Sequence, residues 1–214
     1  MNIFFSLYLA HLIGDYVLQT SYIAKNKNSS IKVLSFHVFI IYISLVSIII
    51  PDNLTNHLLL IFLAIIHFFI DYLKFKNKDI LFFNSSVYYL LDQLFHLSTI
   101  VLVSYFFVPQ RIIISEKWTV ILSLAIFNSF FIGILVSFLF KTIKTYKRDF
   151  IGYIIRFSIP LLYNPIIIVF SIPVYSLIIY IVYKKKGMDN FYEKLFSLYF
   201  SYLFSILILM AWRG

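Results

Sequence analysis

Long apolar runs constrain the fold of this chain more than any other feature. An α-helix that rises about 1.5 Å per residue needs about 20 apolar residues to cross about 30 Å of hydrocarbon. Runs of this kind lie at 2–20, 31–50, 56–73, 86–108, 118–140, 150–183 and 191–212. The sequence therefore predicts an all-α, multi-pass integral membrane helical bundle.

The composition excludes the soluble alternatives. Hydrophobic residues make up 62% of the chain and charged residues 13%, whereas ordinary soluble domains have about 45–50% and about 25%. A soluble protein of 214 residues could not bury so much apolar surface, which argues against a cytosolic enzyme, a secreted domain or a disordered chain. The chain has no cysteine, so disulfides, thiolate metal sites and thiol nucleophiles are excluded.

The apolar stretch 150–183 is too long for one crossing, because as one straight helix it would extend roughly 50 Å. Asn164 precedes Pro165 near its middle, and a residue before proline is pushed out of helical geometry. We predict two helices, 150–163 and 165–183, joined by a tight turn. The chain then has about eight transmembrane helices, in two regions at 1–108 and 109–214.

Basic residues support this count and give an orientation, because cytoplasmic loops are enriched in Lys and Arg. With eight helices and the N-terminus outside, most basic residues fall in cytoplasmic loops, among them Lys27, 141–148 and Lys184–Lys186, while Arg111 and Lys117 lie outside. The net charge of +9 then reflects topology and contact with anionic lipids rather than nucleic-acid binding. We expect a bacterial cytoplasmic (inner) membrane protein with lipid partners; the sequence sets no oligomeric state.

Ionisable residues interrupt the apolar runs in a repeated pattern. The pattern His-x-x-x-Asp-Tyr begins at His11 in the first run and at His67 in the third. The second and fourth runs each contain Phe-His, at His37 and His96. We interpret helices 1–2 and 3–4 as two copies of one hairpin, related by an axis along the membrane normal.

The predicted topology places seven ionisable groups at one depth, roughly 3–15 Å below the cytoplasmic surface when counted along the helices. Residues four apart share a helix face, so each His-Asp pair presents both groups to one neighbour. Ionisable groups in hydrocarbon are costly unless paired or solvated, and they mark functional sites. The seven are His11, Asp15, His37, His67, Asp71, Asp92 and His96.

Imidazoles and carboxylates in such a set suit a divalent metal such as Zn²⁺, Mn²⁺ or Fe²⁺, and we favour zinc. A catalytic zinc site typically has about three protein ligands and an open water position. The candidate ligands are His67, Asp71 and His96, with His11 or His37 completing the set.

Asp15 and Asp92 are the candidate catalytic residues. They would orient the imidazole ligands or act as the general base for a metal-activated water. The same His/Asp set also fits a proton or ion pathway, or a structural polar network between helices. His57 is interpreted as a solvated residue of a short outer loop.

Arg156, Gln19 and Gln93 are the candidate substrate-binding residues. Arg156 lies inside a predicted helix at about the depth of the His/Asp set. It would bind a phosphate or carboxylate headgroup there, pair with one of the buried Asp residues, or reach up to the interface.

The His/Asp residues also carry a family resemblance. The relevant motifs are the run from His11 to Thr20 (HLIGDYVLQT), the lone His37, the His67-x-x-x-Asp71 pair with Lys74, and Leu91-Asp92-Gln93-x-x-His96. In these motifs the N-terminal half resembles the bacterial domain-of-unknown-function family numbered 3307 (DUF3307). That family brings no established activity, so the resemblance implies a shared site and no particular reaction. Its longer members have a Gly-x-x-Glu-Arg-like motif, for which Gly152 to Arg156 has Ile155 in place of Glu.

The leading hypothesis is an integral-membrane, metal-dependent hydrolase that acts on a lipid-like or membrane-delivered substrate near the cytoplasmic leaflet. The first alternative is a small transporter or channel for a proton, a metal ion or a small solute. The second is a substrate-binding or regulatory membrane subunit. The sequence has no phosphate-binding Gly loop, no Gly-x-Ser-x-Gly and no His-Glu-x-x-His motif.

Overall fold

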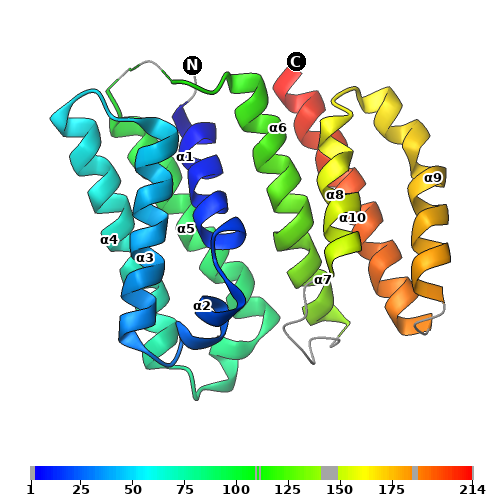
Figure 1. The fold of residues 1–214 in the computed structure, drawn as a ribbon, viewed down its shortest axis with the longest axis horizontal. Helices are drawn as coiled ribbons and strands as arrows, with labels where there is room; N and C mark the ends of the chain where they lie inside the picture. Colours follow the sequence, from blue (N-terminus) through cyan, green and yellow to red (C-terminus); the bar gives the residue numbers. More distant parts are fainter. Residues whose placement is uncertain (1–2, 109, 111, 141–148, 185–187, 214) are drawn as a thin grey trace. The chain divides into compact units, whose positions relative to one another are not determined.

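The computed structural model describes residues 3–108, 110, 112–140, 149–184 and 188–213. These residues form helices and connecting turns, with no strand among them (Figure 1), which confirms the predicted all-α fold. The chain divides into two compact units, unit 1 (Met1–Ser123) and unit 2 (Leu124–Gly214). Unit 1 extends past the predicted region 1–108 because it includes most of α6 (Glu116–Ile126).

Within the described part of the chain, six helices are long and apolar enough to cross a membrane, so the chain is a multi-pass membrane protein. Two further apolar helices are shorter, Ile3–Val17 and Phe150–Leu161. A total of eight crossings and the N-out orientation stay predictions, and the basic residues at Arg111, 141–148 and 185–187 lie outside the described residues. The six are Ile31–Ile49, Leu54–Lys76, Ser86–Phe106, Glu116–Leu139, Pro165–Tyr183 and Asn190–Trp212.

Unit 1 is built on four main helical segments, two short ones and most of α6. The long helices α3 (Ile31–Ile49), α4 (Leu54–Lys76) and α5 (Ser86–Phe106) pack in sequence order, and α1 (Ile3–Leu12) packs against α3 and α5. The helix of α1 continues as a π-helix, η1. The remaining elements are η1 (Ile13–Val17), α2 (Ser21–Asn26) and the 3₁₀ turn η2 (Leu81–Asn84).

The apolar core of unit 1 and its histidines occupy the same helix faces. Leu7, Ile41, Leu63 and Ile100 are buried core residues of α1, α3, α4 and α5. Each lies four residues from a histidine of the same helix, and residues four apart share a face. The face that packs the core therefore also directs one imidazole per helix into the interior. Those imidazoles are His11, His37, His67 and His96.

Unit 2 contains the end of α6, the π-helix η3 (Phe127–Ile132), α7 (Gly133–Leu139), α8 (Phe150–Leu161), α9 (Pro165–Tyr183) and α10 (Met188–Arg213). The helices α8 and α9 pack against α10, and α8 also packs against η3.

The turn between α8 and α9 confirms the predicted break before Pro165. Tyr163 has a left-handed backbone with a φ of 58°, which ends the helical path. The Asn164 side chain then accepts a hydrogen bond from the Ile166 amide at 3.0 Å and caps α9. Proline suits the first helical position that follows such a cap.

Candidate metal centre

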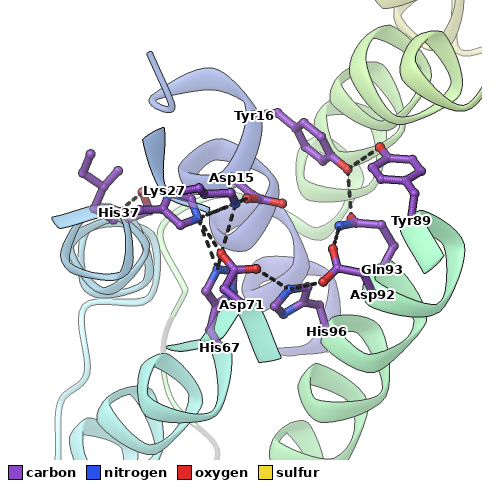
Figure 2. A network of polar contacts seen from close by, with 12 residues as sticks. Asp15, Tyr16, Lys27, His37, His67, Asp71, Tyr89, Asp92, Gln93 and His96 are labelled. Carbon is purple, nitrogen blue, oxygen red and sulfur yellow. Dashed lines mark hydrogen bonds and ion pairs between the residues drawn. The ribbon is translucent and has the colours of Figure 1, made fainter. Parts of the chain in front are cut away.

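All seven predicted His and Asp side chains are buried in unit 1, with at most 5% of each residue exposed. They come from four different helical segments and converge on one another. Figure 2 labels all of them except His11. Three groups among them place one ligand atom per residue within 4.8 Å of the others. These groups are His11 with His67 and His96, Asp15 with His37 and His67, and Asp71 with Asp92 and His96. We call the seven residues the His/Asp cluster.

The Asp71 carboxylate lies at the centre of the His/Asp cluster. Its Oδ2 atom is 3.4 Å from His37 Nε2 and 3.6 Å from His67 Nε2. Its Oδ1 atom is 3.6 Å from His96 Nε2. The two oxygens of one side chain therefore face different imidazoles.

His11, His67 and His96 form a compact group of rings. The ring centroids of His67 and His96 are 4.2 Å apart, and the His11 centroid lies 5.2 Å and 5.1 Å from them. Three imidazoles that converge in this way are the ligand set of many catalytic zinc sites. The structure thus brings His11 next to His67 and His96, while His37 contacts Asp15 and Asp71 and has its Nε2 3.3 Å from His67 Nε2.

Several buried acceptor or donor atoms in this region lack a hydrogen bond. Among the described residues, these include Nδ1 of His37, Nδ1 of His67 and Oδ1 of Asp92. A buried polar atom without a partner costs about 1–3 kcal/mol. A cation bound to Asp92 Oδ1 would recover that cost for this oxygen, and the imidazole and carboxylate groups of the cluster suit a divalent metal.

Lys27 is a member of the centre that the sequence did not reveal. Its ammonium lies 3.0 Å from Asp71 Oδ2, 3.5 Å from Asp15 Oδ1 and 3.2 Å from His37 Nε2. The positive-inside pattern predicts that Lys27 is an ordinary loop charge, but only 14% of its side chain is exposed. Burial lowers the pKa of Lys27, yet the carboxylates of Asp71 and Asp15 outweigh this and hold the pKa above its usual value.

The short helix α2 delivers Lys27 to the centre. The Thr20 hydroxyl accepts a hydrogen bond from the Ile23 amide at 3.3 Å and caps α2, and Ile23 is buried at 3% exposure. Lys27 follows directly at the C-terminal end of α2. The Thr20 cap and the apolar Ile23 within a mostly polar connection were the available sequence signals, and they are weak.

A second set of hydrogen bonds leads away from Asp92 toward the end of η1 (Figure 2). Gln93 Nε2 donates to Asp92 Oδ2 at 3.1 Å, and the Tyr16 hydroxyl donates to Gln93 Oε1 at 2.9 Å. The hydroxyls of Tyr16 and Tyr89 are 3.0 Å apart. The structure therefore places Gln93 beside the His/Asp cluster, together with Tyr16, the tyrosine of the first His-x-x-x-Asp-Tyr pattern, and adds Tyr89, which the sequence did not indicate. Gln19 lies in the connection between η1 and α2 and is partly buried.

Gly14 allows η1 to approach α3 closely. A Cβ atom at Gly14 would lie 2.8 Å from Ile41 Cδ1 and 3.1 Å from Ile41 Cα, closer than ordinary van der Waals contact. The next residue is Asp15, so this close approach sets the distance between the Asp15 carboxylate and His37 on α3.

Arg156 lies in unit 2 and is 2% exposed. Its Nε donates to the Asn128 carbonyl at 3.1 Å, and its Nη2 donates to the Ser129 carbonyl at 3.0 Å. Its Nη1 donates to Ser197 Oγ at 3.1 Å. These partners belong to its own unit, and a role for Arg156 in substrate binding stays a prediction. Gly133 makes room for the guanidinium, since a Cβ there would lie 2.6 Å from Nη2.

His57 lies in a different setting from the one predicted. It belongs to the first turn of α4 rather than to a loop, and it is partly buried. Its Nε2 is 3.2 Å from the Tyr42 hydroxyl. His57 is thus a histidine of unit 1 that is not part of any of the three metal-binding groups.

A multi-pass helical fold with a buried cluster of imidazoles and carboxylates places unit 1 in the class of membrane proteins with a candidate metal centre. Residues 3–124 match a family model described as a protein of unknown function, DUF3307, and the chain belongs to this family. This confirms the resemblance seen in the sequence. The match ends beside the boundary of unit 1 and contains the whole His/Asp cluster. No curated protein and no solved structure matches the chain.

Proposed function

We propose that unit 1 is a membrane-embedded, metal-dependent hydrolase that acts on a lipid-like or membrane-delivered substrate. The observation that carries this proposal is the buried group of three imidazoles, His11, His67 and His96, beside the carboxylates of Asp71 and Asp92. In this proposal the three imidazoles and Asp71 Oδ1 hold one divalent ion, with zinc favoured by the nitrogen-rich set.

A divalent metal with such ligands polarises an ester or phosphoryl oxygen and makes water acidic, with a pKa of about 7. Asp92 is the proposed general base, because one of its oxygens is buried without a hydrogen bond and the other is held by Gln93. Asp92 accepts the proton that the attacking water loses as the water oxygen bonds to the ester carbon or phosphorus. The same proton then goes to the departing alcohol oxygen, so the step balances as a hydrolysis.

The proposed substrate class follows from the surroundings of the His/Asp cluster. Three of the helices that carry it, α3, α4 and α5, are long enough to cross the membrane. Large apolar side chains on their outer faces are exposed, for example Phe36 and Phe39 on α3 at 55% and Phe69 on α4 at 59%. Such faces suit contact with lipid chains, and a substrate that reaches the cluster from there is lipid-like or membrane-delivered.

Metal analysis and lipid cleavage test this proposal together. The full chain would be purified in mild detergent with Zn²⁺ present, and its metal content measured by mass spectrometry. It would then be placed in phosphatidylethanolamine–phosphatidylglycerol vesicles, with release of fatty acid or headgroup followed. We expect about one metal equivalent and chelator-sensitive release.

Variants give the matched comparison. His67→Ala should lose metal and cleavage, whereas His57→Ala, which alters a histidine outside the cluster, should keep both. A folded His67→Ala protein with the metal content of the wild type would contradict the proposed ligand set. Metal binding without any lipid cleavage would contradict the hydrolase.

The continuous polar network favours a second candidate function, a small transporter or channel. Contacts connect Lys27 to Asp71, then His96 and Asp92, and from there Gln93 and Tyr16. A chain of this kind resembles an ion or proton pathway. Zinc-sensitive and pH-sensitive dyes inside the same vesicles would detect flux, and flux without lipid cleavage would favour the transporter.

A further inference from the structure

The two oxygens of Asp71 divide the centre into two cation positions. Oδ1 faces His96, which belongs to the imidazole group of His11 and His67. Oδ2 faces His37, the Lys27 ammonium and also His67, an imidazole that belongs to two of the three metal-binding groups. A carboxylate whose two oxygens face different ligands in this way suits the bridging position of a two-metal hydrolytic site, where the ions lie about 3.5–4 Å apart.

The second position has the spacing of a metal site. Ligands about 2.0–2.1 Å from a tetrahedral metal are about 3.3 Å from one another. His37 Nε2 lies 3.3 Å from Asp15 Oδ1 and 3.4 Å from Asp71 Oδ2. His37 Nε2 is also 3.3 Å from His67 Nε2.

One cation of the protein itself already lies at this second position. The Lys27 ammonium contacts Asp71, His37 and Asp15 at 3.0, 3.2 and 3.5 Å. A metal about 2.1 Å from Asp71 Oδ2 would lie within about 5 Å of this ammonium. Like charges at that distance repel strongly in a water-poor interior, so a second metal and Lys27 exclude each other there.

The formal charges of the buried side chains also indicate that the centre binds one divalent ion. Asp15, Asp71 and Asp92 carry three negative charges, and Lys27 carries one positive charge. With neutral imidazoles, the buried centre has a remaining charge equal and opposite to that of one divalent ion. Buried charge must be compensated, so one divalent ion together with Lys27 balances the centre, whereas two divalent ions beside the Lys27 ammonium would leave it with excess positive charge.

We propose that the Lys27 ammonium is the second cation of a two-cation centre, so that the chain binds one divalent metal where its ligand set could hold two. This inference rests on the proposed metal-dependent function. It makes Lys27 the residue that determines the metal stoichiometry, and it makes α2 part of the centre.

The test is a titration of the purified full chain with Zn²⁺ alone, read by calorimetry and by metal analysis after dialysis. The wild type should bind one equivalent. Lys27→Met keeps the length of the side chain and removes its charge, and it should bind two equivalents. Lys27→Arg should stay at one. Lys25→Met, which changes an exposed lysine of the same helix, is the matched control and should also stay at one.

A charge-balanced double variant keeps the test informative if Lys27→Met does not fold. Lys27→Met with Asp15→Asn restores the original net charge and should bind one equivalent. If Lys27→Met alone yields no folded protein, one equivalent in the double variant supports the proposal, and none or two overturn it.

The outcomes separate this inference from the proposed function. A folded Lys27→Met protein that binds one equivalent, as the wild type does, overturns the role of Lys27 and leaves the metal centre intact. Two equivalents in the wild type also overturn it. A wild type that binds no Zn²⁺ removes the metal-dependent function itself, and this inference with it.

Discussion

The π-helices η1 and η3 hold different positions in their helices: η1 forms the end of the helix that begins as α1, whereas η3 lies inside a longer helix, between α6 and α7. A π-turn shifts the register of a helix and occurs frequently at functional sites. In unit 1, η1 turns the Asp15 carboxylate toward His37 and Lys27. In unit 2, the carbonyl groups of Asn128 and Ser129 in η3 accept hydrogen bonds from Arg156.

The two polar interiors therefore differ in their charge. Around Arg156, a donor-rich side chain meets oxygen acceptors of its own unit, although Asn128 Oδ1 and Asp149 Oδ2 of that unit are buried without a hydrogen bond. In unit 1, the Lys27 ammonium contacts the carboxylates of both Asp15 and Asp71, and buried atoms of His37 and Asp92 have no hydrogen bond. A buried guanidinium that meets oxygen acceptors serves stability, whereas carboxylates that outnumber the ammonium they contact are suited to bind a cation.

Replacement of the central side chain of each polar interior, Asp71 or Arg156, should produce the largest difference between the two units in Zn²⁺ binding and stability. Asp71→Asn takes charge from both cation positions and should weaken Zn²⁺ binding by about a hundredfold or more. Arg156→Met should leave Zn²⁺ binding unchanged and reduce the free energy of unfolding by about 2–4 kcal/mol, because three buried hydrogen bonds are lost. Zn²⁺ titration and denaturation in detergent measure the two effects. A folded Arg156→Met protein without metal would remove the distinction between the units.

Substitution of one glycine in each unit by alanine should give a smaller difference between the units in Zn²⁺ affinity. Gly14→Ala would push η1 away from the backbone of α3, which costs about 1–3 kcal/mol and also moves Asp15, so Zn²⁺ affinity should fall severalfold. Gly133→Ala would press on the Arg156 guanidinium and should cost a similar free energy with no change in Zn²⁺ affinity. The same titration and denaturation experiments apply. Equal loss of affinity in both variants would show that the effect is general destabilisation.

Deletion of one hydroxyl in each unit should give the smallest contrast. Tyr16→Phe removes the donor to Gln93, which orients Asp92, so lipid cleavage should fall severalfold while metal content stays constant. Ser205→Ala removes the 2.7 Å partner of Asn128 and should cost only about 0.6 kcal/mol, a typical value for a hydrogen bond between membrane helices. Initial rates in vesicles and denaturation curves distinguish the two. A Tyr16→Phe protein with wild-type cleavage would argue against a role for Asp92 as the base.

The helices and the His/Asp cluster could be predicted because both depend on short-range periodicity. Apolar run length gives the long helices, the Asn164-Pro165 pair gives the break after α8, and four-residue spacing places His67 and Asp71 on one face. The convergence of the histidines on neighbouring helices followed from their similar depth.

Lys27 and the surroundings of Arg156 could not be predicted in this way. Lys27 reaches Asp71 across the fold from a short capped helix, and no periodicity encodes that contact. The carbonyls of η3 that bind Arg156 are backbone atoms made available by a π-turn, and the sequence Phe-Asn-Ser-Phe-Phe-Ile has no distinctive signal for one.

The four-residue spacing between a core residue and a histidine on α1, α3, α4 and α5 restricts where this chain can gain or lose residues. One residue inserted between Leu63 and His67 would rotate His67 and Asp71 by about 100° around the helix axis, while Leu63 stayed in the core. The helix would still pack, but its two polar groups would face a neighbouring helix or lipid. Insertions and deletions should therefore be confined to the connections between helices, and a change of helix length should be tolerated less well than most substitutions.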